Sequence, residues 1–381
     1  WSRDLGRSLI ELIRLGRGEN VSACIDWVFK LIKRWETDET LLFEGKYRLP
    51  RHVHRMVQIP SVVVGNGCFE NDGHALFSLA VWTYWKRCEG RKEWASKRWE
   101  DIKALGDWFI WQFEHPEISR ATDLLWSDSE ASGWPVKTGE SFYVDYLAME
   151  ALHALSEIAV EQGDMDSAAK WTARTGLMKK AIEKHYIDED GCWRCTCESP
   201  AWKGQTNLVH IISACDRGSM DIKKSIPEWY ETDIRTGKRN CENHDFHKNA
   251  FGYSNGFTIQ NALLIDEMGY ATKFLRECAM MIYHPAISPY LIPEDAMRIR
   301  EHVYARTGDL GNAVQQAEML KALRIIIGID DNGDELVITP RLPEGWDEVI
   351  VEDYPVLIGG KIKKLDYSYN KKNGKVDMRV R

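Results

Sequence analysis

Acidic side chains gather in three polar segments, and each segment precedes a stretch with helical periodicity. The segments are 65–74, 127–140 and 297–316. Cleavage of a glycosidic bond needs two carboxyl groups that flank it, a proton donor and a base or nucleophile, and distant parts of a chain supply them. The pattern therefore favours sugar chemistry, with Asp128 or Glu130 as the acid and Glu301 as the base.

Each of these assignments has a plainer alternative. Asp72, in the first segment, would serve equally as a helix cap that accepts hydrogen bonds from backbone N–H groups. In the second segment we expect at least one acidic residue to be only a solvated loop charge. Glu301 lies in a polar stretch without a cationic partner four residues later, and a surface carboxylate is its alternative.

Aromatic residues in polar surroundings are candidates for sugar contacts. Of the 16 Trp residues, those at helix-periodic positions, such as Trp99 and Trp171, are expected in the core. Trp126 and Trp134 lie in a polar loop, where a flat ring can stack on the apolar face of a pyranose or simply cap a helical hairpin. The predicted substrate-binding residues are Asp72, His74, Trp126, Trp134, Tyr253, Asn255 and Gln260.

Hydrophobic periodicity indicates a mainly α chain. Apolar residues recur at spacings of three and four, which is typical of helices with one buried face. Helices are expected over 3–16, 20–35, 73–88, 96–113, 145–161, 163–185, 205–216, 256–268, 270–283 and 310–328. Helical hairpins joined by alternating short turns and long polar loops favour an (α/α)6 toroid. A solenoid shares the local pattern but should show a fixed repeat period, and none is visible.

The pattern changes after Gly328. Short β-rich runs around 336–338, 349–351, 361–365 and 375–379 alternate with Gly, Pro and Asn-Gly turns. We therefore expect a toroid over 1–330 and a small C-terminal β-appendage, sandwich-like, over 331–381. The chain starts at Trp1 without Met, so a natural N-terminal region or a lost leader is an open alternative.

Charge and composition exclude some partners. The 381 residues carry 50 basic and 58 acidic side chains, a net charge of −8, without a basic run interleaved with aromatics. Nucleic acid is therefore not an expected partner. No apolar stretch approaches the ~20 residues of a membrane span, so a soluble protein is expected. The 9 Cys are scattered and odd in number, which favours a reduced, cytoplasmic setting.

Metal and cofactor chemistry find little support in the motifs. Cys192-Trp-Arg-Cys195-Thr-Cys197 contains a CxxC, but zinc needs four N or S ligands and His185 is the only nearby histidine. We therefore expect no metal. Neither a serine-hydrolase elbow, a P-loop nor a nicotinamide fingerprint is present, so a cofactor-free enzyme is expected. His210, His244 and His247 leave open a sugar epimerase or a polysaccharide lyase on the same scaffold.

Three motifs carry a resemblance to a known group of enzymes. Ala131-Ser-Gly-Trp-Pro followed by Tyr143-Val-Asp-Tyr resembles the Glu-Ser-Gly-Trp-Asp loop and next helix of trehalases and processing α-glucosidases. Ser254-Asn-Gly-Phe-Thr-Ile-Gln260 is similar to their Pro-Asn-Gly-Trp-Ala-Pro-Leu-Gln segment, and Arg300-Glu-His to their Glu-Lys-Tyr element, whose Glu is the base. The order matches over roughly 65–325. The broader resemblance is to six-hairpin glycosidases, including α-L-rhamnosidases.

The resemblance implies an inverting hydrolase, with one departure. The acid of the family is the Asp after Gly-Trp, and this position is Pro135 here, which cannot donate a proton. Either the acid has moved to Asp128 or Glu130, or the chemistry differs. We expect an exo-acting, inverting glycoside hydrolase with a carbohydrate substrate. The alternatives are the epimerase or lyase and, because of Pro135, a non-catalytic carbohydrate-binding protein. The sugar and the oligomeric state cannot be read from the sequence.

Overall fold

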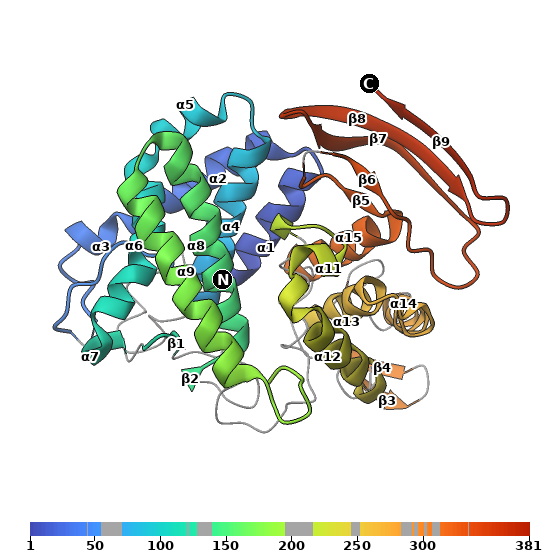
Figure 1. The fold of residues 1–381 in the computed structure, drawn as a ribbon, viewed down its shortest axis with the longest axis horizontal. Coiled ribbons are helices and arrows are strands. Elements are labelled where there is room, and N and C mark those ends of the chain that lie inside the picture. The colour runs from blue at the N-terminus through green and yellow to red at the C-terminus, as the bar shows by residue number, and fades with distance from the viewer. Residues whose placement is uncertain are drawn as a thin grey trace. The chain divides into compact units, whose positions relative to one another are not determined.

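Two inner helices dominate the N-terminal half of the chain (Figure 1). They are α4 (Asn71–Arg87) and α8 (Phe142–Gln162), which pack against each other and are buried along most of their length. Both are buried on every side and have no solvent-facing stripe. Polar groups at their N-terminal ends must therefore find partners inside the protein.

The computed structural model describes residues 1–43, 45–54, 71–119, 122–127, 139–194, 216–244, 252–282, 292, 296–300, 303–306, 313–333 and 335–381. The chain divides into two units, Trp1–Ile13 with Arg17–Trp202 and Arg14–Gly16 with Lys203–Arg381. Among the described residues, no helix is long and apolar enough to span a bilayer.

Shorter and one-sided helices complete the first unit. They are α1 (Ser2–Arg14), α2 (Gly18–Ile32), α3 (Arg34–Thr37), α5 (Arg91–Ser96), α6 (Trp99–Glu114), α7 (Pro116–Ser119) and α9 (Met165–Tyr186). The α8–α9 hairpin turns at Gly163, whose φ of 82° is left-handed. Asp164 then caps α9 by accepting the Ser167 N–H at 3.0 Å. This hairpin confirms the sequence prediction.

Among its described residues, the second unit contains four longer helical elements and two short ones. They are α11 (Ile222–Ser225), the 3-10 helix η4 (Pro227–Trp229), α12 (Tyr230–Asn243), α13 (Gly252–Leu264), α14 (Met268–Ile282) and α15 (Ala313–Ile327). The sequence did not predict α12, because its buried face consists of small and polar residues: Asp233, Thr236, Gly237, Asn240 and Cys241. The helix expected over 205–216 lies outside the described residues except for its last position.

The described strands form four antiparallel sheets. The short pairs are β1 (Trp126–Ser127) with β2 (Gly139–Glu140), β3 (Ala296–Arg300) with β4 (Val303–Arg306), and β5 (Ile329–Asp330) with β6 (Val337–Ile338). The largest sheet has the order β7 (Glu348–Ile358), β8 (Lys361–Asn370), β9 (Lys375–Val380). Strands are thus confirmed after Gly328, whereas the β3–β4 hairpin was not predicted.

The C-terminal sheet packs around a small apolar cluster on one of its faces. Val351 and Val356 of β7, Leu365 and Tyr367 of β8, and Ile329 of β5 form it. The β7–β8 turn at Gly359-Gly360 uses φ values of 57° and 74°, which L-residues with side chains rarely adopt.

Helix α1 approaches α4 so closely that a glycine is required at the crossing. A Cβ on Gly6 would lie 2.7 Å from the backbone carbon of Leu76. We predict that Gly6→Ala lowers the free energy of unfolding by about 1–3 kcal/mol, because overpacking outweighs the better helix propensity of Ala.

Gly176 provides the matched control in α9. A Cβ there meets no atom within 4 Å, so Gly176→Ala should stabilise the protein by roughly 0.5–1 kcal/mol. Urea unfolding of both variants measures the difference. Equal effects of the two substitutions would show that the α1–α4 contact is looser than described.

Candidate active site

The predicted catalytic residues lie outside the described residues. These are Asp128, Glu130 and Glu301, together with the predicted sugar platform Trp134. In the chain, Glu301 stands between Arg300, the last residue of β3, and Val303, the first of β4. Tyr253 and Asn255 fall in the first turn of α13, and their side chains are outside the description. All of these assignments stay predictions.

The frame of the 128–138 segment is described on both sides. Strand β1 precedes it and β2 follows it, and the two pair antiparallel with Trp126 opposite Glu140 and Ser127 opposite Gly139. Helix α8 begins two residues after β2. The ends of the candidate acid segment are therefore brought together directly before an inner helix.

Asn71, the first residue of α4, holds the first of these strands. Its Nδ2 donates to the Trp126 carbonyl oxygen at 3.3 Å and to Gln112 Oε1 at 2.9 Å. Its Oδ1 accepts from Trp108 Nε1 and from Gln112 Nε2, each at 3.0 Å. Asn71 is buried, and both ends of its amide are engaged. The position of the Trp126 backbone is thus coupled to α4 and α6.

Asp145, in the first turn of α8, holds the residue before β1. Its Oδ1 accepts the Leu125 N–H at 2.6 Å, and its Oδ2 accepts the Tyr186 hydroxyl at 2.6 Å. Burial raises the pKa of Asp145 from 3.8 to about 8, against the lowering effect of these two hydrogen bonds. Asp145 is therefore largely protonated at neutral pH, and it secures the loop from the α8 side.

Asp72 is paired with an arginine inside the protein. Its Oδ2 accepts from Arg3 Nε of α1, its Oδ1 accepts the Gly73 N–H at 2.7 Å, and it is fully buried. These contacts agree with a structural role at the start of α4.

At the start of α8, Tyr143 accepts from Arg7 Nη2 at 3.1 Å, and burial raises the pKa of Tyr143 to about 12. Arg3 and Arg7 of α1 thus bind side chains at the N-terminal ends of α4 and α8, respectively.

His74 uses both ring nitrogens on the backbone. Nδ1 accepts the Val53 N–H at 2.9 Å, and Nε2 donates to the Leu105 carbonyl at 2.8 Å. Burial lowers the pKa of His74 to about 4, so the ring is neutral at physiological pH. Because both ring nitrogens are hydrogen-bonded, His74 holds the backbone at Val53 and does not present a free hydrogen-bonding group.

Gln260, predicted to bind substrate, is buried between α13 and α15. Its Nε2 donates to the Glu318 carbonyl at 2.7 Å and to Glu318 Oε2 at 2.8 Å. The two helices approach closely here, because a Cβ on Gly256 would lie 2.5 Å from the Cβ of Glu318. Trp126 is the one predicted sugar contact with a described side chain that is half-exposed.

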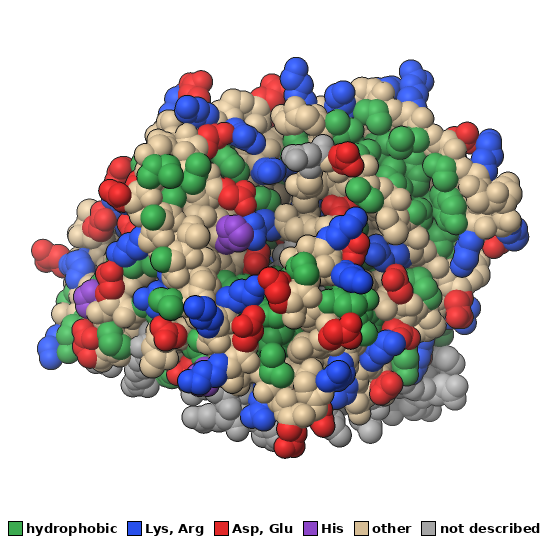
Figure 2. All heavy atoms as spheres, in the orientation of Figure 1, with side chains coloured by type: hydrophobic (Ala, Val, Ile, Leu, Met, Phe, Trp, Pro, Cys, Tyr) green, Lys and Arg blue, Asp and Glu red, His purple; other side chains and the backbone are tan. Residues whose placement is uncertain are grey.

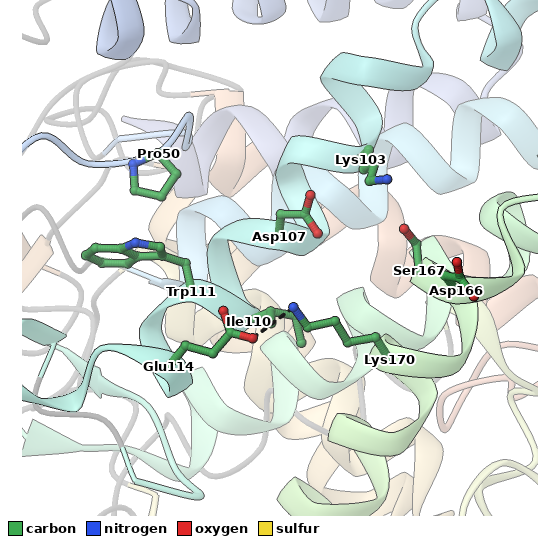
Figure 3. A pocket seen from close by; sticks show the side chains of 9 residues that line it. All are labelled: Pro50, Lys103, Asp107, Ile110, Trp111, Glu114, Asp166, Ser167 and Lys170. Atoms are coloured by element: carbon green, nitrogen blue, oxygen red, sulfur yellow. Dashed lines mark ion pairs between the residues drawn. The ribbon is translucent and has the colours of Figure 1, made fainter.

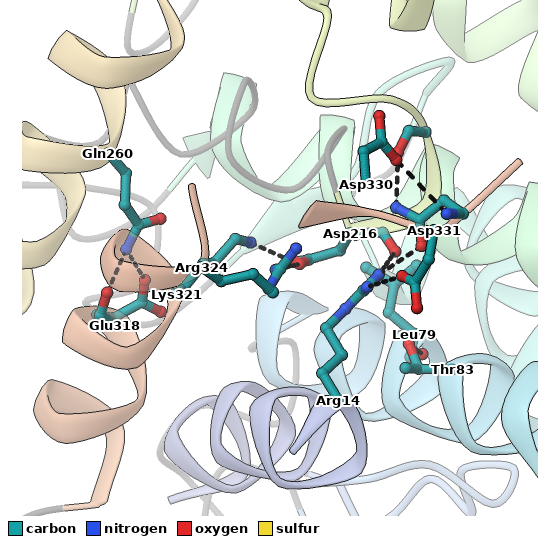
Figure 4. Close-up of polar contacts among 12 residues, drawn as sticks. Arg14, Leu79, Thr83, Asp216, Gln260, Glu318, Lys321, Arg324, Asp330 and Asp331 are labelled. Carbon is teal, nitrogen blue, oxygen red and sulfur yellow. Dashed lines mark hydrogen bonds and ion pairs between the residues drawn. The ribbon is translucent and has the colours of Figure 1, made fainter. Parts of the chain in front are cut away.

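A buried ionic cluster organises the second unit (Figure 4). Asp216 pairs with Lys321 at 2.6 Å and Arg324 at 3.4 Å, both on α15, and its carbonyl accepts from Arg14. Burial alone would raise the pKa of Asp216, but the positive charges of Lys321, Arg324 and Arg14 outweigh it and lower the pKa. Such compensation of the cost of burial by neighbouring opposite charges is typical of structural ion pairs.

The same cluster reaches the C-terminal strands. Arg14 also contacts Asp331 at 3.4 Å and Asn332 at 2.7 Å, and Asp331 accepts the Leu357 N–H of β7 at 2.8 Å. Neighbouring Asp330 accepts the Met220 N–H at 2.9 Å. We interpret this cluster as scaffold rather than as a source of catalytic carboxylates.

A surface cavity of about 380 Å³ lies in the first unit, between α6 and the start of α9 (Figure 3). Trp111, Asp107 and Lys103 line it, and the Lys170–Glu114 ion pair of 2.8 Å crosses it. Trp111 is stacked on Trp108 and also on His115, with ring centroids 5.6 and 4.5 Å apart. The cavity includes no residue of the predicted site.

Metal ligands were also sought. Within the described part of the chain, no group of three or more His, Cys, Asp or Glu side chains could hold a metal ion. Cys192 is buried, and its N–H donates to Asp188 Oδ1 at 2.8 Å in the turn between the bridged residues Ile187 and Trp193. Residues 188–191 therefore form a turn. Cys195 and Cys197 lie outside the described residues.

Sequence reasoning missed Asn71 and Asp145, the two anchors of the loop. Asp145 stands in the Tyr143-Val-Asp-Tyr run that carries the resemblance, but no role was predicted for it. The available signal was a polar residue in the first turn of an otherwise apolar helix, because such a residue must find a buried partner.

The raised pKa of Asp145 gives a testable pH dependence. A folded-state pKa near 8 against 3.8 for the free group means that the folded protein holds a proton that the unfolded chain releases between these values. The contribution of Asp145 to stability is full below pH 3.8 and is lost as pH rises toward 8, with a slope of about 1.4 kcal/mol per pH unit. Asp145→Asn stays neutral, so it should gain stability relative to the wild type over this range.

Denaturation of both proteins from pH 5 to 9 checks this expectation, with Tyr186→Phe as the companion variant. That variant keeps the carboxyl group but removes one donor, so its loss of about 1–3 kcal/mol should be larger at high pH. A constant stability difference between Asp145→Asn and the wild type at every pH would mean that Asp145 is ionised in the folded protein.

Comparison with known proteins gives a consistent result. Residues 54–214 match the family model of the bacterial alpha-L-rhamnosidase 6 hairpin glycosidase domain. A wild-type glycosidase structure has a TM-score of 0.57 at 13% identity, covering 85% of this chain and 87% of its own. A search of curated protein sequences found no match.

Two further solved structures share the fold. A GH78 family rhamnosidase of Bacillus sp. GL1 has a TM-score of 0.55 at 15% identity, over 100% of this chain and 37% of its own. A bacterial glucoamylase complexed with acarbose has a TM-score of 0.54 at 13% identity, over 85% and 48% of the two chains. At such identities the likeness establishes the fold, a mainly α (α/α)6 toroid. Residues 54–214 are thus similar to a six-hairpin glycosidase domain, and the fold is the one that the sequence resemblance implied.

Proposed function

We propose that the protein is an exo-acting, inverting glycoside hydrolase that removes a terminal sugar from an oligosaccharide or glycoside. Asp128 or Glu130 acts as the acid and Glu301 as the base. The observation that supports the proposal is the anchoring of the two residues that lead toward the 128–138 segment, Trp126 by Asn71 and Leu125 by Asp145. A proton donor must be held within about 0.5 Å of its working position, and buried anchors from two inner helices supply such a frame.

In this proposal the two carboxyl groups divide the chemistry. The acid protonates the glycosidic oxygen as the bond breaks, while Glu301 takes a proton from water that attacks from the opposite face. Inversion requires a separation of roughly 6.5–9.5 Å between the two groups, because the water must fit between base and sugar. The reaction consumes only water, so no cofactor is part of the proposal.

Substrate contacts are assigned to the aromatic and polar residues of the loops. Trp126 is half-exposed at the start of the anchored segment, and Trp134, Tyr253 and Asn255 complete the proposed set. Asp72 and His74 are engaged with partners inside the protein, as is Nε2 of Gln260, so we assign these three residues a supporting role at the site. The matching family model makes α-L-rhamnosides the first substrates to test, and glucosides the second, because one similar glycosidase was solved in complex with glucose.

Two broader assignments accompany the function. We propose that residues 1–330 form the toroid and 331–381 the β-appendage, in keeping with the strands that follow α15. A reduced, cytoplasmic setting is proposed from the cysteines, of which Cys24, Cys88, Cys192, Cys241 and Cys278 are free thiols.

The first functional prediction concerns the reaction. Aryl α-L-rhamnosides, aryl glucosides and the corresponding oligosaccharides should release a monosaccharide, with or without a chelator. Proton NMR of the initial product should show the anomer opposite to that of the substrate. An isomerised sugar without cleavage would indicate an epimerase, and an unsaturated product a lyase. Binding without turnover would indicate a carbohydrate-binding protein.

The second functional prediction concerns the acid and the base. Glu301→Gln removes the charge that activates water, so turnover should fall by a factor of roughly 10² to 10⁴ while substrate binding survives. For Asp128→Asn and Glu130→Gln, one variant alone should lose activity severely with poor leaving groups and mildly with activated aryl groups, because a good leaving group needs no proton.

Glu348→Gln, on an exposed position of β7, is the matched control and should retain wild-type turnover. Steady-state kinetics on a leaving-group series distinguishes these cases. Normal turnover of Glu301→Gln, or loop variants that are indifferent to the leaving group, would refute the assignment and turn attention to Glu140.

A further inference from the structure

The edge strand β9 exposes an apolar row on the sheet face that carries the buried apolar cluster. Val376, Met378 and Val380 are 56%, 60% and 37% exposed. They stand opposite Tyr369, Tyr367 and Leu365 of β8, and the last two belong to the apolar cluster of the sheet. A hydrophobic area is visible over these strands in Figure 2. The apolar face therefore continues beyond the elements that cover it.

The same three residues carry the backbone groups of the open edge. Lys364 and Arg381 exchange both hydrogen bonds, N to O at 3.0 and 2.8 Å, so the backbone of Arg381 faces β8. Because antiparallel strands alternate, the N–H and C=O groups of Val380, Met378 and Val376 face away from β8. Among the described strands, none pairs with this side of β9.

The sequence of β9 is complementary to itself in one antiparallel register. When Met378 is placed opposite Met378 of a second copy, Val376 stands opposite Val380, and all three outward-facing residues find hydrogen-bonding partners. Asp377 then stands opposite Arg379 twice, in the positions where cross-strand side chains lie nearest. In this register two β9 strands therefore pair their backbone groups, align their apolar residues and place opposite charges next to each other.

Neighbouring registers are disfavoured by charge. Centring the pair on Asp377 would oppose Asp377 with itself and Lys375 with Arg379, and centring it on Arg379 would oppose that residue with itself. In the Met378 register, Arg379 lies between Asp366 of its own β8 and Asp377 of the second copy, since Asp366 is its register partner. The outer face would then carry alternating charges across the junction.

From these observations we propose that two copies of the chain associate through β9. The strands pair antiparallel about a two-fold axis at Met378, and the two sheets become one of six strands. This is strand addition at a sheet edge, with the main chain supplying affinity and the Asp377–Arg379 pairs supplying register. It is independent of the catalytic proposal, because no proposed site residue lies on β9.

A charge-swap series tests the interface. The wild type should be a dimer that dissociates on dilution in sedimentation velocity or in gel filtration with light scattering. Asp377→Arg and Arg379→Asp should each raise the dimer dissociation constant at least tenfold, because each places like charges opposite each other twice. The double variant Asp377→Arg/Arg379→Asp restores opposite charges and should return the dissociation constant to near the wild-type value.

Lys363→Glu is the matched control, since it reverses an exposed charge on β8 at a position that has no β9 partner. It should leave dimerisation unchanged, and circular dichroism should show that every variant is folded. A wild type that stays monomeric at all concentrations would overturn the proposal, as would single reversals without effect or a folded double variant that fails to dimerise.

Discussion

Burial of α4 and α8 is the constraint on which the rest of the first unit depends. In a helix without a solvent-facing stripe an unpaired polar side chain is costly, because the group loses its hydration without compensation. The polar residues at the start of these two helices are therefore engaged. Asn71 binds the Trp126 carbonyl, Asp145 binds the Leu125 N–H, and Asp72 binds Arg3.

The two units meet this constraint by different chemistry. In the first unit, Asp145 is surrounded by neutral donors, so burial raises its pKa to about 8 and the carboxyl group stays protonated near neutral pH. In the second, Asp216 is equally buried but stands against Lys321, Arg324 and Arg14, and its pKa is lowered. The sign of the shift is decided by the neighbouring charges and not by burial, which both carboxyl groups share.

Sequence patterns predicted the elements whose buried faces are apolar. The α8–α9 hairpin, the inner helix α4 and the strands after Gly328 all follow from periodicity and turn residues, and Trp171 is in the core as expected. Helix α12 was missed, because Asp233, Thr236 and Asn240 face inward and erase the apolar period. Periodicity reports side-chain polarity, whereas burial depends on partners that distant segments supply.

The site residues show the same limit of sequence patterns, which report polarity but not the partners of a buried group. Loop carboxylates can be found in a sequence because polar segments before helices are easy to see, and this led to Asp128, Glu130 and Glu301. The residues that position the loop, Asn71 and Asp145, are each single polar residues within apolar helices. Nothing local distinguishes them from His74 or Gln260, which were predicted as substrate contacts and which bind backbone or helix partners in the structure.

This arrangement also bears on Pro135, which stands where related enzymes have their acid. Proline fixes its own φ and restricts the residue before it, so the Trp134–Pro135 pair stiffens the segment at the position that lost the carboxyl group. The described residues on either side of the segment are held in place, Leu125 and Trp126 by hydrogen bonds and Gly139 and Glu140 by pairing with β1. An acid relocated to Asp128 or Glu130 would lie next to the anchors, where the frame is best defined. For this reason our proposal places the acid on the β1 side of the segment, at Asp128 or Glu130.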